Sequence, residues 1–423
     1  MKKEAYFATA EELARGGLEA IPSQMISGKH LIYSSPATAW HLTRPGAEGF
    51  GVKRAGLAVP DSIMLIVAPG CCGRNTSLIS SMPEYNDRFF YLMMDETDIV
   101  TGRHLKKIPK AVKEICDCCE KKPSVVMICI TCVDALLGTD MERVCRKAEE
   151  KVDIPVRPCY MYALTREAES RRWSIYGSLC ILFWNRRRKK EMWSIFLDFF
   201  SPLVDECELY EILHQAGVKT VHEISRCRDY EEYQTMSQAN FNLVLHPEAR
   251  FAAEDFHDRL KIPFIELRRL YQVDKIENQY RALGQVLGVA FDQKKYKAEA
   301  LEAVEQFREA VRMRFLQLGE CMNGDPFELG LALVRYGFKV PEIYGTITAE
   351  NFVYIRNLAK LSPKTRVFSN MEPTMLYYDP VSSGVNITIG KDAAIIIRIS
   401  QMQCGTRIVS HTAMQACEGC LRR

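Results

Sequence analysis

Apolar runs that are too short for a typical helix constrain the fold more than any other feature of the chain. Residues 61–69 (DSIMLIVAP) and 124–131 (SVVMICIT) are almost continuously apolar. Strands that are apolar on both faces are typical of a parallel sheet covered by helices on each side. Residues 108–123, between the two runs, have apolar positions at helical spacing. We therefore expect parallel strands joined by crossover helices.

The same alternation continues beyond the second run. Residues 139–152 have a helical pattern that Thr139 can cap, and residues 154–162 form a weaker strand pattern. Together these elements make a βαβαβ unit, which right-handed crossovers would make doubly wound.

Strand and helix patterns alternate again over about residues 192–270, and once more after two long helices expected at 275–288 and 295–319. The predicted fold class is therefore α/β, with three Rossmann-like doubly wound domains and mostly parallel sheets. The expected division is an N-terminal approach segment (1–60), a first Rossmann-like domain (61–190), a second (191–275) and a third α/β domain with long helices (276–423).

Composition limits the partners and the compartment. The chain has 423 residues, and its net charge of +3 gives no reason to expect nucleic acid or an anionic membrane as a partner. The N-terminus has no apolar segment of a signal peptide, and the longest apolar run is too short to span a bilayer. We expect a cytoplasmic protein whose 16 cysteines stay reduced and serve as core filler, metal ligands or reactive groups.

Three of these cysteines follow the ends of predicted strands. Cys71 and Cys72 come directly after Pro69-Gly70, and Cys132 closes the second apolar run. The carboxyl ends of parallel strands meet at one edge of the sheet, where ligands bind in open α/β folds. Thiolates from two distant segments would therefore converge there, which predicts a metal or metal–sulfur site.

The other thiols and histidines have weaker claims. Cys116, Cys118 and Cys119 end the helix that leads into residues 124–131, about 26 Å from Cys132 along a strand, so one metal ion cannot bridge them. Cys129 lies within a strand and is expected in the core. Cys159, near the end of the third predicted strand, is a weak further candidate ligand. The remaining groups are interpreted mainly as structural or surface residues: the CEGC stretch at 417–420, His41, His411 and the basic stretch 183–193.

Nucleotide-binding motifs are absent from the sequence. There is no G-x-x-x-x-G-K-[ST] phosphate loop, so the chain is not expected to hydrolyse ATP itself. The glycines of residues 49–56 (GFGVKRAG) do not match G-x-G-x-x-G and precede a strand instead of following one.

With these motifs in view, the chain resembles the component 1 (dinitrogenase-type) superfamily of nitrogenase-like oxidoreductases. Residues 35–76 are similar to the family segment in which a strand leads into a glycine-flanked ligand cysteine. The Thr-Cys that ends residues 124–132, followed by the turn at 137–140, resembles the next family segment. The resemblance covers about residues 35–270 well and the rest loosely.

The resemblance implies an iron–sulfur cluster, 4Fe-4S or related, shared with a partner subunit. Cys132 matches one ligand position, and Cys71 or Cys72 matches another. The family's first ligand cysteine would fall at residues 34–40, where this chain has none. The second thiol of the Cys71-Cys72 pair, a carboxylate or the partner would then complete the cluster. A helix expected near Asn75 would direct its positive dipole end toward the cluster.

The resemblance also implies partners and a reaction class. The partner subunit would be a second copy or a paralogous component 1 subunit, and a P-loop iron protein would deliver electrons. The first hypothesis is a reductase subunit that passes low-potential electrons to an unidentified substrate, with catalytic residues unknown. Dinitrogen is disfavoured, because no counterpart of the family's active-site cofactor ligands is found. The alternatives are a non-catalytic scaffold for cluster or cofactor assembly, and an α/β protein whose thiols only pack.

Overall fold

The structure is a computed structural model that describes residues 4–22, 25, 56–70, 85–160, 193–197, 203–245, 249–311, 314–319, 324–369, 372–379, 384–390 and 393. The chain divides into two compact units. One is drawn from residues 45–203 and 217–268, and the other from residues 1–44, 204–216 and 269–423. Each unit is described by itself.

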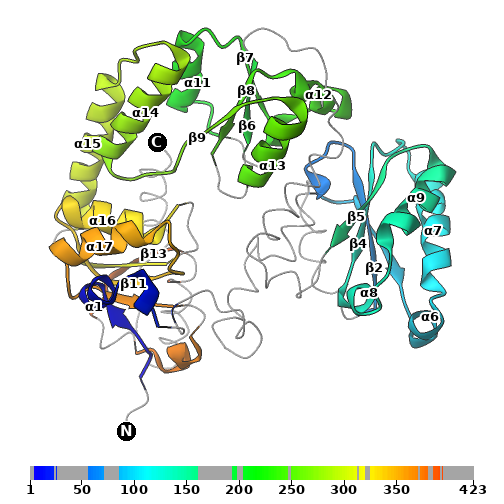
Figure 1. Ribbon diagram of the computed structural model, residues 1–423, viewed down its shortest axis with the longest axis horizontal. Coiled ribbons are helices and arrows are strands. Elements are labelled where there is room, and N and C mark those ends of the chain that lie inside the picture. The colour runs from blue at the N-terminus through cyan, green and yellow to red at the C-terminus, as the bar shows by residue number, and fades with distance from the viewer. Residues whose placement is uncertain are drawn as a thin grey trace. The chain divides into compact units, whose positions relative to one another are not determined.

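The first sheet contains the two apolar runs. Its strands are β2 (Ile63–Ala68), β3 (Phe89–Met93), β4 (Val126–Ile130) and β5 (Val156–Tyr160), in the order β3-β2-β4-β5 and all parallel. Every residue of β2 and β4 is buried. Both strands lie in the middle of the sheet (Figure 1), which explains why they are apolar on both faces.

Helices cover one face of this sheet. They are α6 (Glu96–Thr101), α7 (His104–Cys118), the short α8 (Cys132–Leu136) and α9 (Met141–Val152). Buried side chains of α7 and α9 pack with Val126, Ile128 and Ile130 of β4 in one core cluster. Met127 and Cys129 belong to a second cluster on the opposite face, as the alternation of side chains along a strand requires.

The second sheet lies in the same unit. Its strands are β6 (Trp193–Leu197), β7 (Thr220–Glu223), β8 (Phe241–Val244) and β9 (Phe264–Glu266), in the order β7-β6-β8-β9 and all parallel. The helices between them are α12 (Tyr230–Thr235) and α13 (Arg250–Asp255), which continues as a π-helical turn over Phe256–Leu260.

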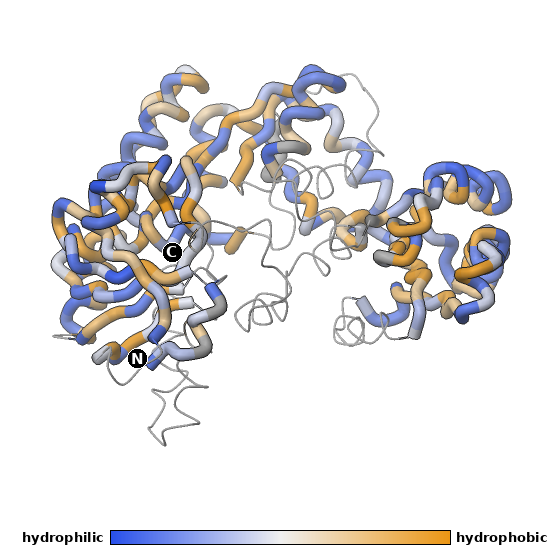
Figure 2. Tube along the Cα trace, turned by 60° about the horizontal axis from the view of Figure 1, so that its bottom comes forward, coloured by the Kyte–Doolittle hydropathy of each residue, from blue (hydrophilic) through white to orange (hydrophobic). Residues whose placement is uncertain are grey.

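The other unit has a five-stranded sheet. Its order is β1 (Ala8–Thr9), β12 (Arg366–Phe368), β11 (Lys339–Tyr344), β10 (Phe315–Leu318) and β13 (Ile387–Ile389), with only β1 antiparallel to its neighbour. Its helices are α1 (Ala10–Gly16), α11 (Glu208–Gln215), α14 (Val273–Leu287), α15 (Lys294–Ala310), α16 (Pro326–Arg335) and α17 (Phe352–Leu361). Figure 2 shows hydrophobic and hydrophilic stretches alternating along the helices, as one-sided packing requires.

Three local predictions were wrong. The helix expected at 295–319 ends at Ala310, and β10 begins at Phe315. The half-exposed strand β3 was not predicted, and it extends the βαβαβ unit to four strands. The N-cap of α9 is Asp140, whose carboxylate accepts from Arg143 N at 3.0 Å, and not Thr139. The predicted domain boundaries stay predictions.

None of the helices in the described part of the chain combines the length and apolar character needed to cross a membrane.

Candidate functional site

The carboxyl ends of β2 and β4 form the switch point of the first sheet. The two strands pair in parallel from Ile63↔Val126 to Val67↔Ile130. β3, the strand after β2, lies on one side of this pair, and β5, the strand after β4, lies on the other side. Such a reversal of strand order opens a crevice between the two following loops, which is where open α/β sheets bind ligands.

Cys132 lies at this switch point. It is the first residue of α8, two positions after the end of β4. Extending the register places Thr131 opposite Ala68, so Cys132 is level with Pro69 on the neighbouring strand. Cys71 and Cys72 follow only two and three residues later but lie outside the described residues. The structure therefore places the backbone of one predicted ligand, and the approach to the other two, at one sheet edge.

Two features beside Cys132 fit a bound group. A Cβ atom added to Gly70, the last described residue of this segment, would meet no heavy atom of the described residues within 4 Å. Thr131 Oγ1 is buried, and it has no hydrogen-bond partner among the residues described. A buried hydroxyl without a partner is costly, so a partner outside the described set is expected.

A buried polar network lies behind the turn that contains Cys132. His104 Nε2 is 3.0 Å from Asp134 Oδ1, and both side chains are at most 1% exposed. Thr139 Oγ1 donates to the same Asp134 oxygen at 3.0 Å. His104 Nδ1 donates to the carbonyl oxygen of Asp98 at 3.0 Å. Sequence reasoning missed this network, because His104 and Asp134 are 30 residues apart and its members match no motif.

The Asp98 carboxylate, at the outer end of this network, is paired with two cations. Its oxygens accept from Lys107 Nζ at 2.6 Å and from Arg103 Nε at 2.9 Å. These two cations, Lys107 first, lower the pKa of Asp98 to about 2. Asp98 therefore stays ionised at neutral pH and fixes the corner between α6 and α7.

Four of the other described thiols pack in or against the core clusters of this unit. Cys129 and Cys159 are fully buried in the core cluster, which confirms the prediction for Cys129. Burial raises the pKa of the Cys145 and Cys227 thiols to about 12, so they are not thiolates at neutral pH. The described residues contain no group of three or more His, Cys, Asp or Glu side chains that could hold a metal ion.

The thiols at the far end of α7 are less buried: Cys116 and Cys119 are half-buried, and Cys118 is exposed. Cys116 and Cys118 are in its last turn and Cys119 is its C-cap, at the end of the helix that leads away from the switch point. Burial is the main cause that raises the pKa of both Cys116 and Cys119.

Several residues singled out in the sequence lie outside the described residues. They are Cys71, Cys72, Asn75, His41, His411, Cys417, Cys420, residues 34–40 and residues 183–192.

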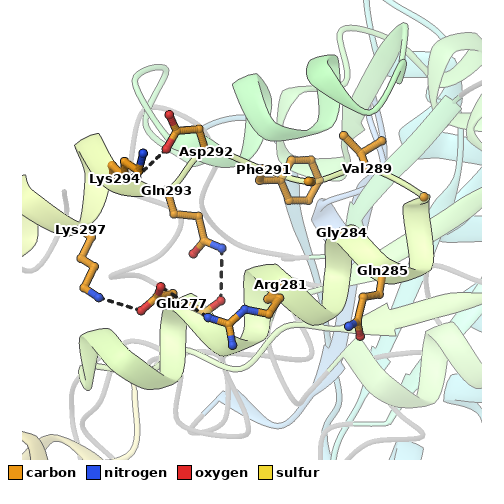
Figure 3. A pocket seen from close by; sticks show the side chains of 12 residues that line it. Glu277, Arg281, Gly284, Gln285, Val289, Phe291, Asp292, Gln293, Lys294 and Lys297 are labelled. Atoms are coloured by element: carbon orange, nitrogen blue, oxygen red, sulfur yellow. Dashed lines mark hydrogen bonds and ion pairs between the residues drawn. The ribbon is translucent and has the colours of Figure 1, made fainter.

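A separate pocket of about 570 Å³ lies in the hairpin between α14 and α15 (Figure 3). Its polar side chains already pair with each other: Lys297 Nζ donates to Glu277 at 2.9 Å, and Gln293 Nε2 donates to the Glu277 carbonyl at 3.3 Å. Gly284 lets the hairpin loop approach α14, since a Cβ there would lie 2.4 Å from the Val289 carbonyl oxygen. The pocket is lined by no thiol or imidazole, and we assign no chemistry to it.

The family model described as Nitrogenase component 1 type Oxidoreductase matches residues 48–350, which is most of the chain and includes the switch point. The chain belongs to this family. Membership confirms the resemblance expected from the two cysteine segments.

Curated proteins of this family with similar sequences are nitrogenase iron-molybdenum cofactor biosynthesis proteins NifE. The protein from Clostridium pasteurianum is 25% identical over 250 residues, or 58% of this chain and 54% of that protein. The one from Klebsiella pneumoniae is 25% identical over 289 residues, or 62% and 61%. The Rhizobium meliloti protein is 35% identical over 112 residues, 26% of this chain and 23% of its own. The matched stretch thus spans about half of the first relative.

Solved structures give the fold of this component 1 type chain. The structure titled "Nitrogenase Cp1 at pH 6.5" superimposes with a TM-score of 0.63 and 16% identity, covering 83% of this chain and 82% of the other. A second structure, "Nitrogenase Cp1 at pH 5", gives a TM-score of 0.60. Together with the mostly parallel sheets, this confirms the predicted α/β fold class with Rossmann-like domains.

Proposed function

We propose that this chain is a component 1 type subunit that holds an iron–sulfur cluster at the carboxyl edge of its first sheet. Cys132 would supply one thiolate and Cys71 or Cys72 another. The observation that carries the proposal is the pairing of β2 with β4 at a switch point, which brings the loops of both cysteine segments to one edge. The buried Thr131 hydroxyl, which has no partner among the described residues, supports it.

Chain topology supports the same ligand set. Helices α7 and α9 occupy one face of the sheet, so the right-handed rule predicts the connection from β2 to β3 on the opposite face. That connection contains Cys71 and Cys72, and Tyr85 near its end packs against the cluster of that face. Thr131 shares this face with Met127 and Cys129 by strand alternation. The two cysteine segments would therefore meet in front of Thr131.

The chemistry of the donor set suits the cluster. Thiolates are the ligands of iron–sulfur clusters, and burial and hydrogen bonds to sulfur tune their reduction potentials. When bound, a 4Fe-4S or related cluster supplies one-electron transfer at low potential. The chain itself would hold the cluster by its thiolates, exclude water with the apolar ends of β2 and β4, and direct Thr131 toward the site.

The reaction we propose is reduction of an unidentified substrate, other than dinitrogen, with electrons from an ATP-dependent iron protein. The absence of a phosphate loop in all 423 residues fits this division of labour. A second component 1 subunit, the same chain or a paralogue, would supply the thiolate that residues 34–40 lack. We propose the cytoplasm as the compartment, since it keeps exposed thiols reduced.

A second function, a non-catalytic scaffold for building a metal cluster or cofactor, is favoured by one observation. The curated relatives named above are cofactor biosynthesis proteins. Both functions need the same cluster-holding edge, so the ligands do not separate them.

Electron transfer separates the two roles. Anaerobically purified protein loaded with its cluster would be mixed with an ATPase iron protein, ATP and dithionite, and the cluster's oxidation state followed by its spectrum. We expect the cluster to be reduced only when ATP is present, and to be re-oxidised when a substrate is added. Transfer of the bound metal to an apo-acceptor protein without ATP-dependent electron transfer would contradict the reductase and favour the scaffold.

A further inference from the structure

The buried network behind the Cys132 turn is unexplained by the proposed ligand set. It joins three segments: the first residue of α7, the middle of α8 and the turn before α9. Its side chains are His104, Asp134 and Thr139, with both hydrogen bonds to Asp134 Oδ1 at 3.0 Å. Placing an imidazole and a carboxylate together in a core, each at most 1% exposed, is costly unless they pair.

The backbone of the turn is folded around Asp134. Thr139 N donates to the Asp134 carbonyl at 3.0 Å, and Leu137 N donates to the Val133 carbonyl at 3.0 Å. Gly138 has φ +63°, a conformation that favours glycine. Asp134 is thus tied through its side chain and through its backbone, and Cys132 is only two residues before it.

Asp134 is badly placed to be a ligand itself. Successive residues of an α-helix are about 100° apart, so Asp134 lies roughly 200° around α8 from Cys132. Its carboxylate contacts α7 and the start of α9, which cover the face opposite to the one that Thr131 shares. The carboxylate therefore braces the turn from behind.

His104 connects this brace to a rigid corner. Its Nδ1 donates to the Asp98 carbonyl, and the Asp98 side chain is held by Lys107 and Arg103. A continuous set of hydrogen bonds therefore runs from the corner between α6 and α7 to the residue two positions after Cys132.

We propose that His104 and Asp134 are positioning residues, which fix the backbone of Cys132 so that its thiolate is presented to the cluster in one geometry. The inference rests on the proposed function. Partners in the outer shell of a metal site typically change metal affinity about 10- to 100-fold when they are removed. The pair here acts through the backbone, so the lower end of that range is expected.

The test compares cluster properties in loaded, anaerobically purified variants. His104→Leu removes both hydrogen bonds, His104→Gln keeps one amide donor, and Thr139→Val removes a single bond to Asp134. Ser62→Ala is the matched control, because Ser62 is fully buried and hydrogen-bonded to Gly56 O and Arg88 at the opposite, amino end of β2.

In His104→Leu we expect iron to be lost to a chelator about tenfold faster and the electron paramagnetic resonance spectrum of the reduced cluster to be changed. His104→Gln should recover most of the wild-type spectrum, and Thr139→Val should show a smaller change of the same kind. Ser62→Ala should keep the wild-type spectrum and release rate, even if it unfolds more easily.

The outcomes distinguish this inference from the proposed function. Wild-type protein that takes up no iron would overturn both. If the loaded variants Thr139→Val and His104→Leu keep the spectrum and the iron-release rate of loaded wild type, the inference alone is overturned. If His104→Leu does not fold, Thr139→Val decides. In cluster-free protein, amide hydrogen exchange over residues 132–139 should be faster in Thr139→Val and unchanged in Ser62→Ala; equal rates in all three would also contradict the inference.

Discussion

Two sheets of this chain differ in how completely the buried polar side chains at their central strands are paired. Beside the end of β4, Thr131 Oγ1 is buried and has no hydrogen-bond partner among the described residues. In β10 and β11, by contrast, Gln317 Nε2 donates to Glu342 Oε2 at 2.7 Å. Tyr378 OH donates to the same carboxylate oxygen at 2.6 Å.

In the network around Glu342, nearly every buried polar atom has a hydrogen-bond partner. Glu342 also pairs with Arg366, and Tyr344 OH accepts from Gln317 Nε2 at 2.6 Å. Burial raises the pKa of Tyr344 well above its ordinary value, so the phenol stays neutral. Only Gln317 Oε1 in this network lacks a partner in the described part of the chain. Parallel topology brings strand ends together in both sheets, but among the described residues the buried polar atoms at β10 and β11 are mostly paired, whereas the Thr131 hydroxyl beside the end of β4 is not.

The largest loss of stability is expected for the network around Glu342, in which nearly every buried polar group is paired. Glu342→Ala leaves Arg366, Gln317 and Tyr378 without their shared acceptor, and removing one partner of a buried ion pair costs about 3–5 kcal/mol. Amide hydrogen exchange in β10 and β11 measures the loss, with Glu342→Gln as the control that keeps a polar group. A loss of unfolding free energy below about 1 kcal/mol would mean that the paired network contributes little to the stability of this sheet.

A smaller, pH-dependent effect is expected at the corner between α6 and α7. The pKa of Asp98 in the folded chain is about 2, below its ordinary value of 3.8, because of Lys107 and then Arg103. A depressed pKa means that ionised Asp98 stabilises the fold above pH 4 and that this stabilisation is lost as the pH falls toward 2.

Asp98→Asn should therefore be less stable than wild type above pH 4, and the difference should shrink between pH 4 and pH 2. Acid unfolding followed by circular dichroism checks this. Asp117→Asn is the control, since Asp117 pairs with Lys113 on the exposed side of α7. A difference between wild type and Asp98→Asn that is independent of pH would contradict the assignment.

The smallest effect is expected at Thr131, beside the end of β4. Thr131→Val replaces a hydroxyl with a methyl group of similar volume. If the hydroxyl has no protein partner, cluster-free protein should keep or slightly gain stability. Tyr378→Phe removes a hydroxyl that donates to a buried carboxylate and should cost about 1.5–3 kcal/mol. Denaturant unfolding compares the two. A loss above about 1 kcal/mol in Thr131→Val would show that a protein group pairs with Thr131.

Much of this comparison could be read from the sequence and some could not. The buried strands β2 and β4 were predictable, because an apolar run ended by Pro-Gly or by Thr-Cys has few alternatives. Strand β3 was missed because its side chains are only partly buried. The helix predicted at 295–319 continued too far because no glycine or proline separates Ala310 from Phe315.

The polar networks were hidden for another reason. Asp134 and His104 meet only through tertiary packing, across 30 residues of chain. Glu342 did leave a signal, a charged residue inside the apolar strand KVPEIY, which is unusual for a buried strand. The backbone position of Cys132 at the switch point could be predicted from topology, whereas the polar side chains behind it could not.

The most direct test of the central claim is the iron and acid-labile sulfide content of anaerobically purified protein. Wild type would be compared with Cys132→Ala, with Cys71→Ala/Cys72→Ala and with Cys129→Ala. Cys129 is a matched control because it lies in β4, three residues before Cys132, and is fully buried. The account predicts stoichiometric iron and sulfide in wild type and Cys129→Ala, and their loss in the other two. Iron-free wild type, or iron retained in Cys132→Ala, would contradict it.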